Sequence, residues 1–236
     1  MKPFNQLKKS VFLEDPAARL MLGPPGLGLR AGHLHEIVPD GIFHLGAAAG
    51  FALGLATQLR RPGALIWIQQ DMAALEGGRP YGPGSAHFGF DPACLLLVRT
   101  ATAKDALWAM EESLRCSGVA AVIGELSGAG EAADLTATRR LNLAMRARGT
   151  LGLLLRQQPL RGTSACASRW IVHAAHGRGD GFGGIGRTAF ALTLEKNRHG
   201  PCGGFTLEWN RDERCFRAAL PVAVAAPAAD RPHRAA

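Results

Sequence analysis

Apolar blocks of strand length and helix length alternate along the middle of the chain. Short apolar runs predict buried strands at 64–69, 94–98, 119–123 and 151–155, and the segment 33–38 is also strand-like. Longer segments with apolar residues at helical spacing predict helices at 43–59, 102–115 and 132–148. The stretch 71–88 is expected to be a long loop. Unbroken apolar strands that alternate with helices indicate an α/β fold, in which helices cover both faces of a mostly parallel sheet.

After residue 160 the pattern changes to consecutive strands. Segments 169–174, 188–196 and 204–209 are joined by glycine-rich turns, which predicts antiparallel hairpins that extend the sheet. A cluster of helix- and strand-breaking residues, 23–28, lies near the end of an expected N-terminal arm, residues 1–30. The core is expected to span 31–217, and the Ala/Pro/Arg-rich residues 218–236 predict a disordered tail.

Size and charge narrow the classes of function. The 236 residues, 47% of them hydrophobic, suffice for one larger domain, or for one domain with a small appendage. Residues 1–136 carry 11 basic and 13 acidic side chains, whereas residues 137–236 carry 16 basic and 6 acidic ones. The net charge of +8 therefore comes from the C-terminal part. Such a basic part is expected for a nucleic-acid or acidic-protein partner, although solvated arginines in an arginine-rich chain would give the same count.

The cysteines and the apolar segments indicate a cytoplasmic protein. Five cysteines form no C-x-x-C pair and no signal peptide is recognisable, so we expect reduced thiols and no structural zinc. The apolar run 42–59 is shorter than the roughly 20 residues of a membrane span and is rich in alanine and glycine. We interpret it as a buried core helix and expect no membrane association.

The loop after the first predicted strand keeps the spacing of a phosphate-binding loop but not its chemistry. Such a loop reads G-x-x-x-x-G-K-[ST], where the lysine reaches the phosphates and the hydroxyl holds Mg²⁺. Here Gly41 and Gly46 keep the spacing, whereas Ala47 and Ala48 stand at the lysine and hydroxyl positions. The sequence therefore predicts an ATPase frame without ATPase activity and without a bound metal or cofactor, although backbone N–H groups leave weak nucleotide binding open.

Several segments around this loop resemble RecA-type ATPases in order and spacing. They lie at 32–37, 67–71, 89–97, 121–126, 153–157 and 194–207, so the resemblance covers roughly residues 30–210. With its degenerate loop, the chain is most similar to the ImuA family, which are RecA-like proteins of the bacterial SOS mutasome. This resemblance implies a RecA-like core and an adaptor for ImuB, and through ImuB for an error-prone replicative-type polymerase.

The resemblance also assigns relic positions around the loop. Asp71 matches the catalytic carboxylate of RecA-type ATPases, Glu125 the acid that organises Mg²⁺, and Gln157 the glutamine that senses the γ-phosphate. Because the loop lacks its lysine and hydroxyl, we expect all three to be structural remnants rather than catalytic groups. An ATPase that uses Lys104 or Lys196 from elsewhere in the chain stays open as an alternative.

Arginines near the predicted carboxyl edge of the sheet are candidates for DNA or partner contacts. In RecA, the loops after the magnesium and glutamine strands contact DNA, and here these loops are 127–131 and 158–164. The candidates are Arg139, Arg140, Arg146, Arg148, Arg156, Arg161 and Arg169. Phosphate contacts by such residues would give salt-dependent, sequence-independent binding, whereas a solvated helix surface or an acidic protein partner explains them equally.

These observations predict a cytoplasmic, nucleoid-associated adaptor or regulator of damage-induced mutagenic DNA synthesis and repair. ImuB is the expected partner, with RecA and DNA as further ones. A weak DNA-dependent ATPase and a cell-division inhibitor similar to SulA are the two alternatives.

Overall fold

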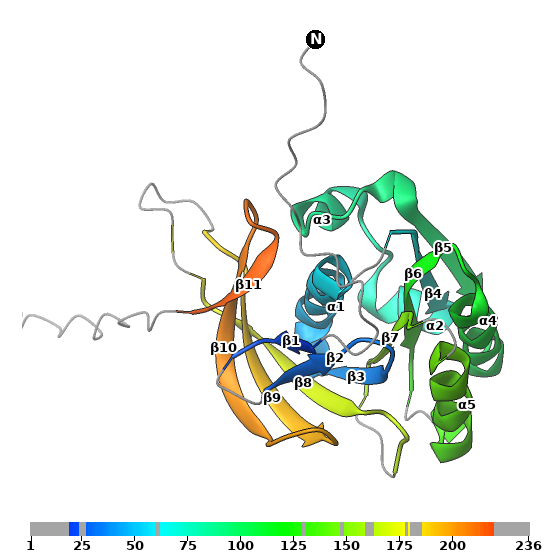
Figure 1. Cartoon of the computed structure of the whole chain (residues 1–236). Coiled ribbons are helices and arrows are strands. Elements are labelled where there is room, and N and C mark those ends of the chain that lie inside the picture. Colours follow the sequence, from blue (N-terminus) through cyan, green and yellow to red (C-terminus); the bar gives the residue numbers. More distant parts are fainter. Residues whose placement is uncertain are drawn as a thin grey trace, which may run out of the picture.

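The computed structural model describes residues 19–23, 27–59, 62–128, 131–146, 149–158, 163–177, 179 and 186–219. Its centre is a nine-stranded sheet with the strand order β11-β10-β9-β8-β3-β7-β6-β4-β5 (Figure 1). Neighbours from β8 to β5 pair in parallel, while β9, β10 and β11 each run antiparallel to the strand before them. The predicted α/β class, with its parallel sheet and C-terminal antiparallel strands, is confirmed.

The eight predicted strands agree with the structure to within a few residues, whereas the ninth strand of the sheet, at its edge, was not predicted. The sheet comprises β3 (Leu34–Pro39), β4 (Ala64–Gln70), β5 (Leu95–Thr100), β6 (Val119–Leu126), β7 (Leu151–Arg156), β8 (Ser168–Ala175), β9 (Ala189–Asn197), β10 (Gly203–Asn210) and β11 (Cys215–Ala218). A separate two-stranded hairpin, β1 (Arg19–Met21) and β2 (Gly28–Arg30), precedes it. Leu22, Leu27 and Leu29 in and beside these strands are buried, so the described residues 19–23 and 27–30 of the expected arm pack on the chain's own core.

Helices cover both faces of the sheet. They are α1 (Leu45–Leu59), α2 (Asp71–Gly77), α3 (Gly82–His87), α4 (Ala103–Arg115) and α5 (Leu135–Arg146), with the 3₁₀ turns η1 (Ile42–His44), η2 (Pro92–Cys94) and η3 (Glu131–Ala133). Thr102 caps α4 by accepting a hydrogen bond from the Asp105 amide. The prediction of a long loop at 71–88 is wrong, because α2 and α3 are too short to show a helical period.

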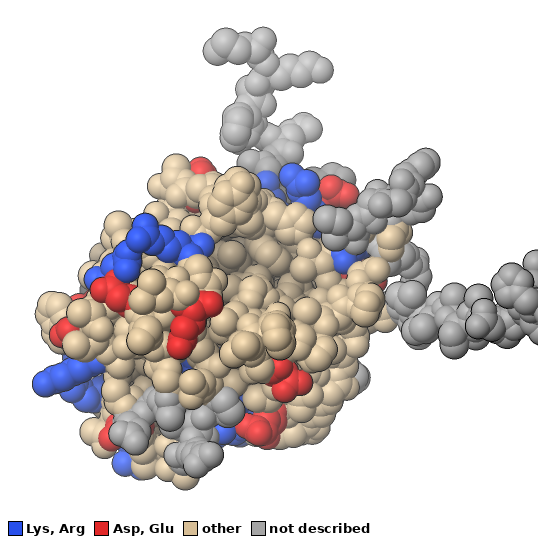
Figure 2. All heavy atoms as spheres, turned by 180° about the vertical axis from the view of Figure 1, so that it is seen from behind, with Lys and Arg blue, Asp and Glu red and all other residues tan. Residues whose placement is uncertain are grey.

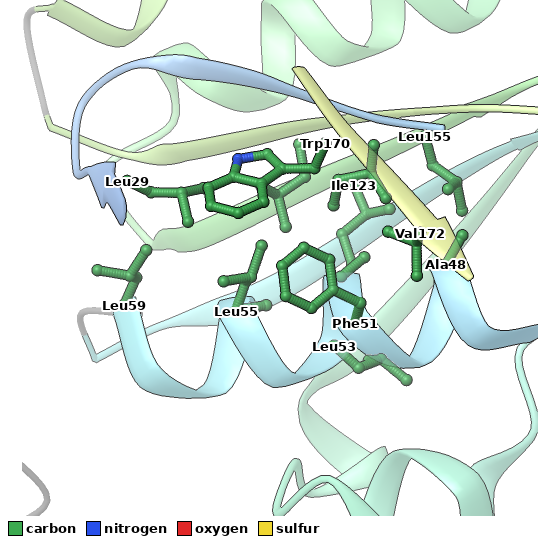
Figure 3. Close-up of a cluster of buried hydrophobic side chains, with 14 of the residues drawn as sticks. Leu29, Ala48, Phe51, Leu53, Leu55, Leu59, Ile123, Leu155, Trp170 and Val172 are labelled. Carbon is green, nitrogen blue, oxygen red and sulfur yellow. The ribbon is translucent and has the colours of Figure 1, made fainter. Parts of the chain in front are cut away.

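The two faces of the sheet carry separate hydrophobic cores. On one face, α1 lies inside the curve made by β8 to β11, where Phe51 and Leu55 pack beside Trp170 (Figures 1 and 3). Gly54 is required there, because a Cβ on it would lie 2.4 Å from the Phe216 ring. On the other face, α4 and α5 pack against each other and bury Met110.

The apolar run from Ile42 to Leu59 becomes the central helix α1. By length and composition alone this run could cross a membrane. Nine of the fifteen residues of α1 are buried within the protein, which is what the sequence analysis expects of a core helix that is apolar on all sides.

Candidate functional site

The degenerate loop lies at the carboxyl edge of β3, where α/β proteins commonly bind ligands. Gly41 there has φ +93° and leads into η1. The His44 amide donates to the Gly41 carbonyl at 3.1 Å, and the Leu45 amide donates to the Ile42 carbonyl. In a phosphate-binding loop, such amides face the anion. Here these two amides are already bonded inside a 3₁₀ turn.

Beside the loop, a buried hydrogen-bond cluster surrounds Glu125 on β6. Its Oε2 accepts hydrogen bonds from Trp67 Nε1 at 3.0 Å and from Gln69 Nε2 at 2.9 Å, both on β4. Its Oε1 accepts a long one, 3.5 Å, from Gln157 Nε2, which follows β7. Burial raises the pKa of the Glu125 carboxyl, and these three donors partly oppose that rise. The structure thus brings two of the three relic positions, Glu125 and Gln157, into direct contact.

Helix α2 covers this cluster. Its backbone carbonyls accept hydrogen bonds from the two glutamines: Gly78 from Gln69 Nε2 at 2.7 Å and Ala73 from Gln157 Nε2 at 2.9 Å. A Cβ on Gly77 would lie 3.1 Å from Gln157 Nε2, 3.6 Å from Glu125 Oε1 and 3.7 Å from Leu45 Cδ1. The end of α2 therefore packs beside Glu125 and Gln157 and approaches Leu45, which follows the degenerate loop's 3₁₀ turn.

The third relic position, Asp71, does not join the cluster. It is the first residue of α2, is about half exposed, and forms an ion pair with Arg99 on β5. Arg99 lies on β5 and Glu125 on β6, and these two strands flank β4 on opposite sides. The two carboxylates are therefore not arranged as a metal-binding pair. Within the described ranges, no group of three histidine, cysteine or acidic side chains is placed to hold a metal ion.

Neither candidate lysine reaches the loop. Lys196 Nζ donates to the Ser164 carbonyl at 2.7 Å, near the amino end of β8 and therefore at the opposite edge of the sheet. Lys104 begins α4 after β5, four strand positions from β3, which corresponds to about 19 Å across the sheet.

Arg156 was predicted to contact DNA or a partner, and the structure contradicts this. Arg169 forms an ion pair with the same buried carboxylate, that of Glu36. The Arg156 side chain is 1% exposed and lies 3.0 Å from Glu36 Oε1, so it cannot contact DNA or a partner. Arg169 Nε donates to Glu36 Oε2 at 3.0 Å, and Arg169 Nη1 lies 3.2 Å from Glu195 Oε2. Both arginines hold a carboxylate in the interior instead of forming a basic surface.

The other arginines divide by their surroundings. Arg140 on α5 pairs with Glu111 on α4 at 2.6 Å, whereas its exposed neighbour Arg139 lines a pocket at the amino edge of the sheet. Arg146 ends α5, and Arg148 and Arg161 lie outside the described residues. Figure 2 shows basic and acidic side chains interspersed on the face seen there, so the excess positive charge does not form one continuous basic face on that side.

Sequence reasoning missed Trp67 and Gln69 as partners of Glu125, and His33, Arg198 and His199 as neighbours of Arg139. The signal for the first pair was present, because Trp67 and Gln69 alternate on one face of a strand beside β6. The second group comes from two segments far apart in the chain and carries no common motif.

We expect the Glu125→Gln variant to be at least as stable as the wild type at neutral pH. Because the pKa of Glu125 is raised in the native state, the native chain binds a proton more tightly than the unfolded chain. The free energy of unfolding therefore falls as the pH rises from the ordinary pKa of 4.5 through the raised pKa. A glutamine abolishes that loss because its side chain does not ionise. Its amide also brings N–H donors near Gln69 Oε1 and Gln157 Oε1, which are buried with no hydrogen-bond partner among the described residues.

Urea unfolding followed from acid to neutral pH measures this effect. The Glu125→Ala variant is the control: it leaves buried donors unsatisfied and should lose about 1–3 kcal/mol. A glutamine variant as unstable as the alanine variant at neutral pH would show that the carboxylate charge itself holds the cluster together.

Comparison with known proteins supplies the family. No known family profile matches the chain. The chain is 36% identical over 199 residues to Protein ImuA from two strains of Caulobacter vibrioides, and the match covers 78% of this chain and 78% of each relative. This similarity extends over most of both chains, and on that basis the protein belongs to the ImuA family.

Proposed function

We propose that this protein is a non-catalytic adaptor in SOS-induced mutagenic DNA synthesis, with a RecA-like core that has lost ATP turnover. It would bind ImuB, and through ImuB an error-prone replicative-type polymerase, in the cytoplasm near the nucleoid, with RecA as a further partner. Family membership supports this role. The observation that carries the non-catalytic part is the engagement of Glu125, whose carboxylate is held by Trp67, Gln69 and Gln157 beside α2.

The missing lysine and hydroxyl are one argument against nucleotide chemistry, and the hydrogen bonds of the loop and of α2 are a second. Phosphoryl transfer depends on cations and N–H donors placed around the γ-phosphate. Here the loop amides of His44 and Leu45 are bonded within η1, and α2 presents carbonyl oxygens to the neighbouring glutamines. Restoring a lysine and a hydroxyl would therefore leave these two amides bonded within η1 and the Glu125 carboxylate engaged by Trp67 and Gln69.

Accordingly, the loop-repaired variant Ala47→Lys/Ala48→Ser is expected to show no saturable binding of a fluorescent ATP analogue with Mg²⁺, like the wild type. Equilibrium fluorescence anisotropy measures this binding, and circular dichroism verifies folding. Micromolar binding by the wild type that Lys104→Ala or Lys196→Ala abolishes would contradict the proposal and favour the ATPase alternative.

Exposed apolar side chains lie in the degenerate loop and on α2, and they support a protein partner on this surface. Ile42 and Phe43 in η1 are 71% and 89% exposed, and Met72 and Leu75 on α2 are 51% and 81% exposed. The two segments meet where Gly77 approaches Leu45. Exposed apolar residues grouped around a former catalytic site are typical of a protein–protein interface. We propose that ImuB docks on this surface.

Co-purification with tagged ImuB from nuclease-treated extracts tests the adaptor role. The Phe43→Asp/Leu75→Asp variant is expected to lose at least about tenfold in affinity, because it places charge where apolar contact is needed. The matched control is Trp108→Asp, which changes a residue that is 63% exposed on α4, on the other side of the sheet. Equal retention of ImuB by both variants would rule out the docking surface, and no retention by the wild type would rule out the adaptor role. Filamentous growth of undamaged cells on overexpression would instead support the SulA-like alternative.

A further inference from the structure

A positively charged pocket lies at the amino edge of the sheet, opposite the degenerate loop. Its volume is about 570 Å³, within the range of roughly 300–1,000 Å³ that is usual for ligand sites. It lies between the start of β3, the helix α5, the segment before β8 and the turn after β9. The lining residues are Gly32, His33, Arg139, Asn142, Leu143, Ala165, Ala167, Arg198 and His199.

The charge of this pocket is uncompensated. Arg139 and Arg198 are both exposed and come from different elements. Among the described residues, neither guanidinium forms an ion pair with a carboxylate, whereas Arg140, next along α5, is paired with Glu111. The lining contains no acidic residue. Arg198 Nη2 donates to the neutral Ser164 carbonyl at 3.4 Å. Two guanidinium groups that line one pocket without an acidic partner favour an anionic ligand.

The pocket is also fixed in shape. The Asn142 side chain accepts a hydrogen bond from the Leu34 amide at 3.2 Å and donates to the carbonyls of Thr138 and Ala165 at 3.0 and 2.9 Å. These bonds hold α5 against β3 and the segment before β8. The Arg198 amide donates to the Ala167 carbonyl at 2.9 Å, which fixes the turn after β9. The arginines therefore project from a preformed frame.

One wall of the pocket consists of rings and apolar surface. The imidazoles of His33 and His199 meet edge to face, with ring centroids 4.9 Å apart. Leu143, on α5, is 62% exposed. Proteins that bind single-stranded nucleic acid combine cations for the phosphates with planar or apolar side chains against which unstacked bases lie. An acidic peptide would use the arginines but would leave the rings and Leu143 without a matching surface.

We propose that this pocket binds single-stranded nucleic acid, with Arg139 and Arg198 on successive phosphates and a base against the wall of His33, His199 and Leu143. This inference deepens the proposed function, on which it rests, since it gives the adaptor a direct contact with the template of mutagenic synthesis. The contact would lie at the amino edge of the sheet, away from the exposed apolar residues proposed for ImuB.

Fluorescence anisotropy with labelled oligo(dT), at a series of salt concentrations, tests the proposal on the full chain. For single strands, the slope of log K against log[salt] changes by about 0.7 for each phosphate that the protein no longer neutralises. The Arg139→Ala/Arg198→Ala variant should therefore bind at least about tenfold more weakly, with a slope reduced by about 1.4. Arg140→Ala is the control on the same helix, and its slope should equal that of the wild type.

Three results would overturn the proposal: no binding of oligo(dT) by the wild type at low salt, equal slopes for the double variant and the control, or displacement of the oligonucleotide by polyglutamate at matched charge. The last would identify an acidic-peptide site. A second variant, His33→Ala/His199→Ala, should weaken binding with an unchanged slope, because it removes the wall for the base and keeps both phosphate-binding arginines. Co-purification of ImuB with Arg139→Ala/Arg198→Ala, after nuclease treatment, separates the two proposals, since loss of DNA binding alone leaves the adaptor role intact.

Discussion

Replacing Glu36 with alanine is expected to destabilise the protein by about 3–5 kcal/mol, the usual effect of removing one partner from a buried ion pair. The Glu36 side chain on β3 is fully buried. Its Oε1 lies 3.0 Å from Arg156 Nε, and its Oε2 accepts hydrogen bonds from Arg169 Nε at 3.0 Å and Ser164 Oγ at 2.9 Å. Without the carboxylate, the Arg156 guanidinium, which is 1% exposed, keeps its charge in the interior beside the neutral Ala133 carbonyl, to which its Nη2 donates.

Urea or thermal unfolding of the purified variant measures this loss. Glu195→Ala is the matched control, because Glu195 also pairs with Arg169 but its side chain is 53% exposed. Exposed pairs contribute about 0–1 kcal/mol, so the control should stay near the wild type. A loss below about 1 kcal/mol in the Glu36 variant would mean that Arg156 finds solvent or another acceptor once the carboxylate is gone. The arginines Arg156 and Arg169 would then be free to serve a surface after all.

Acidification is expected to remove about 3 kcal/mol of stability through His35 alone, between pH 6.5 and about 4. His35 is fully buried on β3, and burial lowers the pKa of its imidazole to about 4. Its hydrogen bonds also select the neutral ring. Trp170 Nε1 donates to Ser168 Oγ at 2.8 Å, so the Ser168 hydroxyl can donate to His35 Nδ1 at 2.7 Å, while Nε2 donates to the Arg30 carbonyl at 2.8 Å.

The direction of this pH effect follows from the lowered pKa. The unfolded chain binds the His35 proton near the ordinary value of 6.5, and the native chain binds it only near 4. Below pH 6.5, protonation therefore favours the unfolded state, and the full stability is present only above that value. A His35→Gln variant should be less stable at pH 7, by about 1–3 kcal/mol for its disrupted hydrogen bonds, but should lose less stability on acidification.

Denaturant unfolding of both proteins at pH 7, 6, 5 and 4 gives the contribution of His35 as the difference between the two curves. His176→Gln, at an exposed position, controls for the removal of a histidine as such. Parallel curves for the wild type and the His35 variant would show that the buried imidazole accepts a proton in the native state without cost. In that case Ser168 must turn its hydroxyl to accept instead of donate.

Local pattern determined the parts of this protein that depend on neighbours in sequence. The apolar runs predicted the strands β4, β6 and β7 because a strand buried on both faces needs apolar residues at consecutive positions. The helix predicted at 132–148 corresponds to α5, and Gly149 just beyond it has φ +66° and donates its amide to the Met145 carbonyl, as glycine often does after a helix. The degenerate loop, Gly41 to Ala48, could also be identified from residue types and spacing alone.

The candidate sites needed the tertiary structure, because their residues meet only across strands. Arg156 and Arg169 read as surface cations in the sequence, yet the sheet places both against Glu36, more than a hundred residues earlier in the chain. Glu125 and Gln157 became neighbours because β6 and β7 pair in parallel, and α2, which no pattern predicted, covers them. The sequence by itself thus determined the fold class and placed alanines where a phosphate-binding loop has its lysine and hydroxyl. Only the tertiary structure decided that α2 packs beside Glu125 and Gln157 and that a basic pocket lies at the opposite edge, because burial and charge pairing depend on which strands become neighbours.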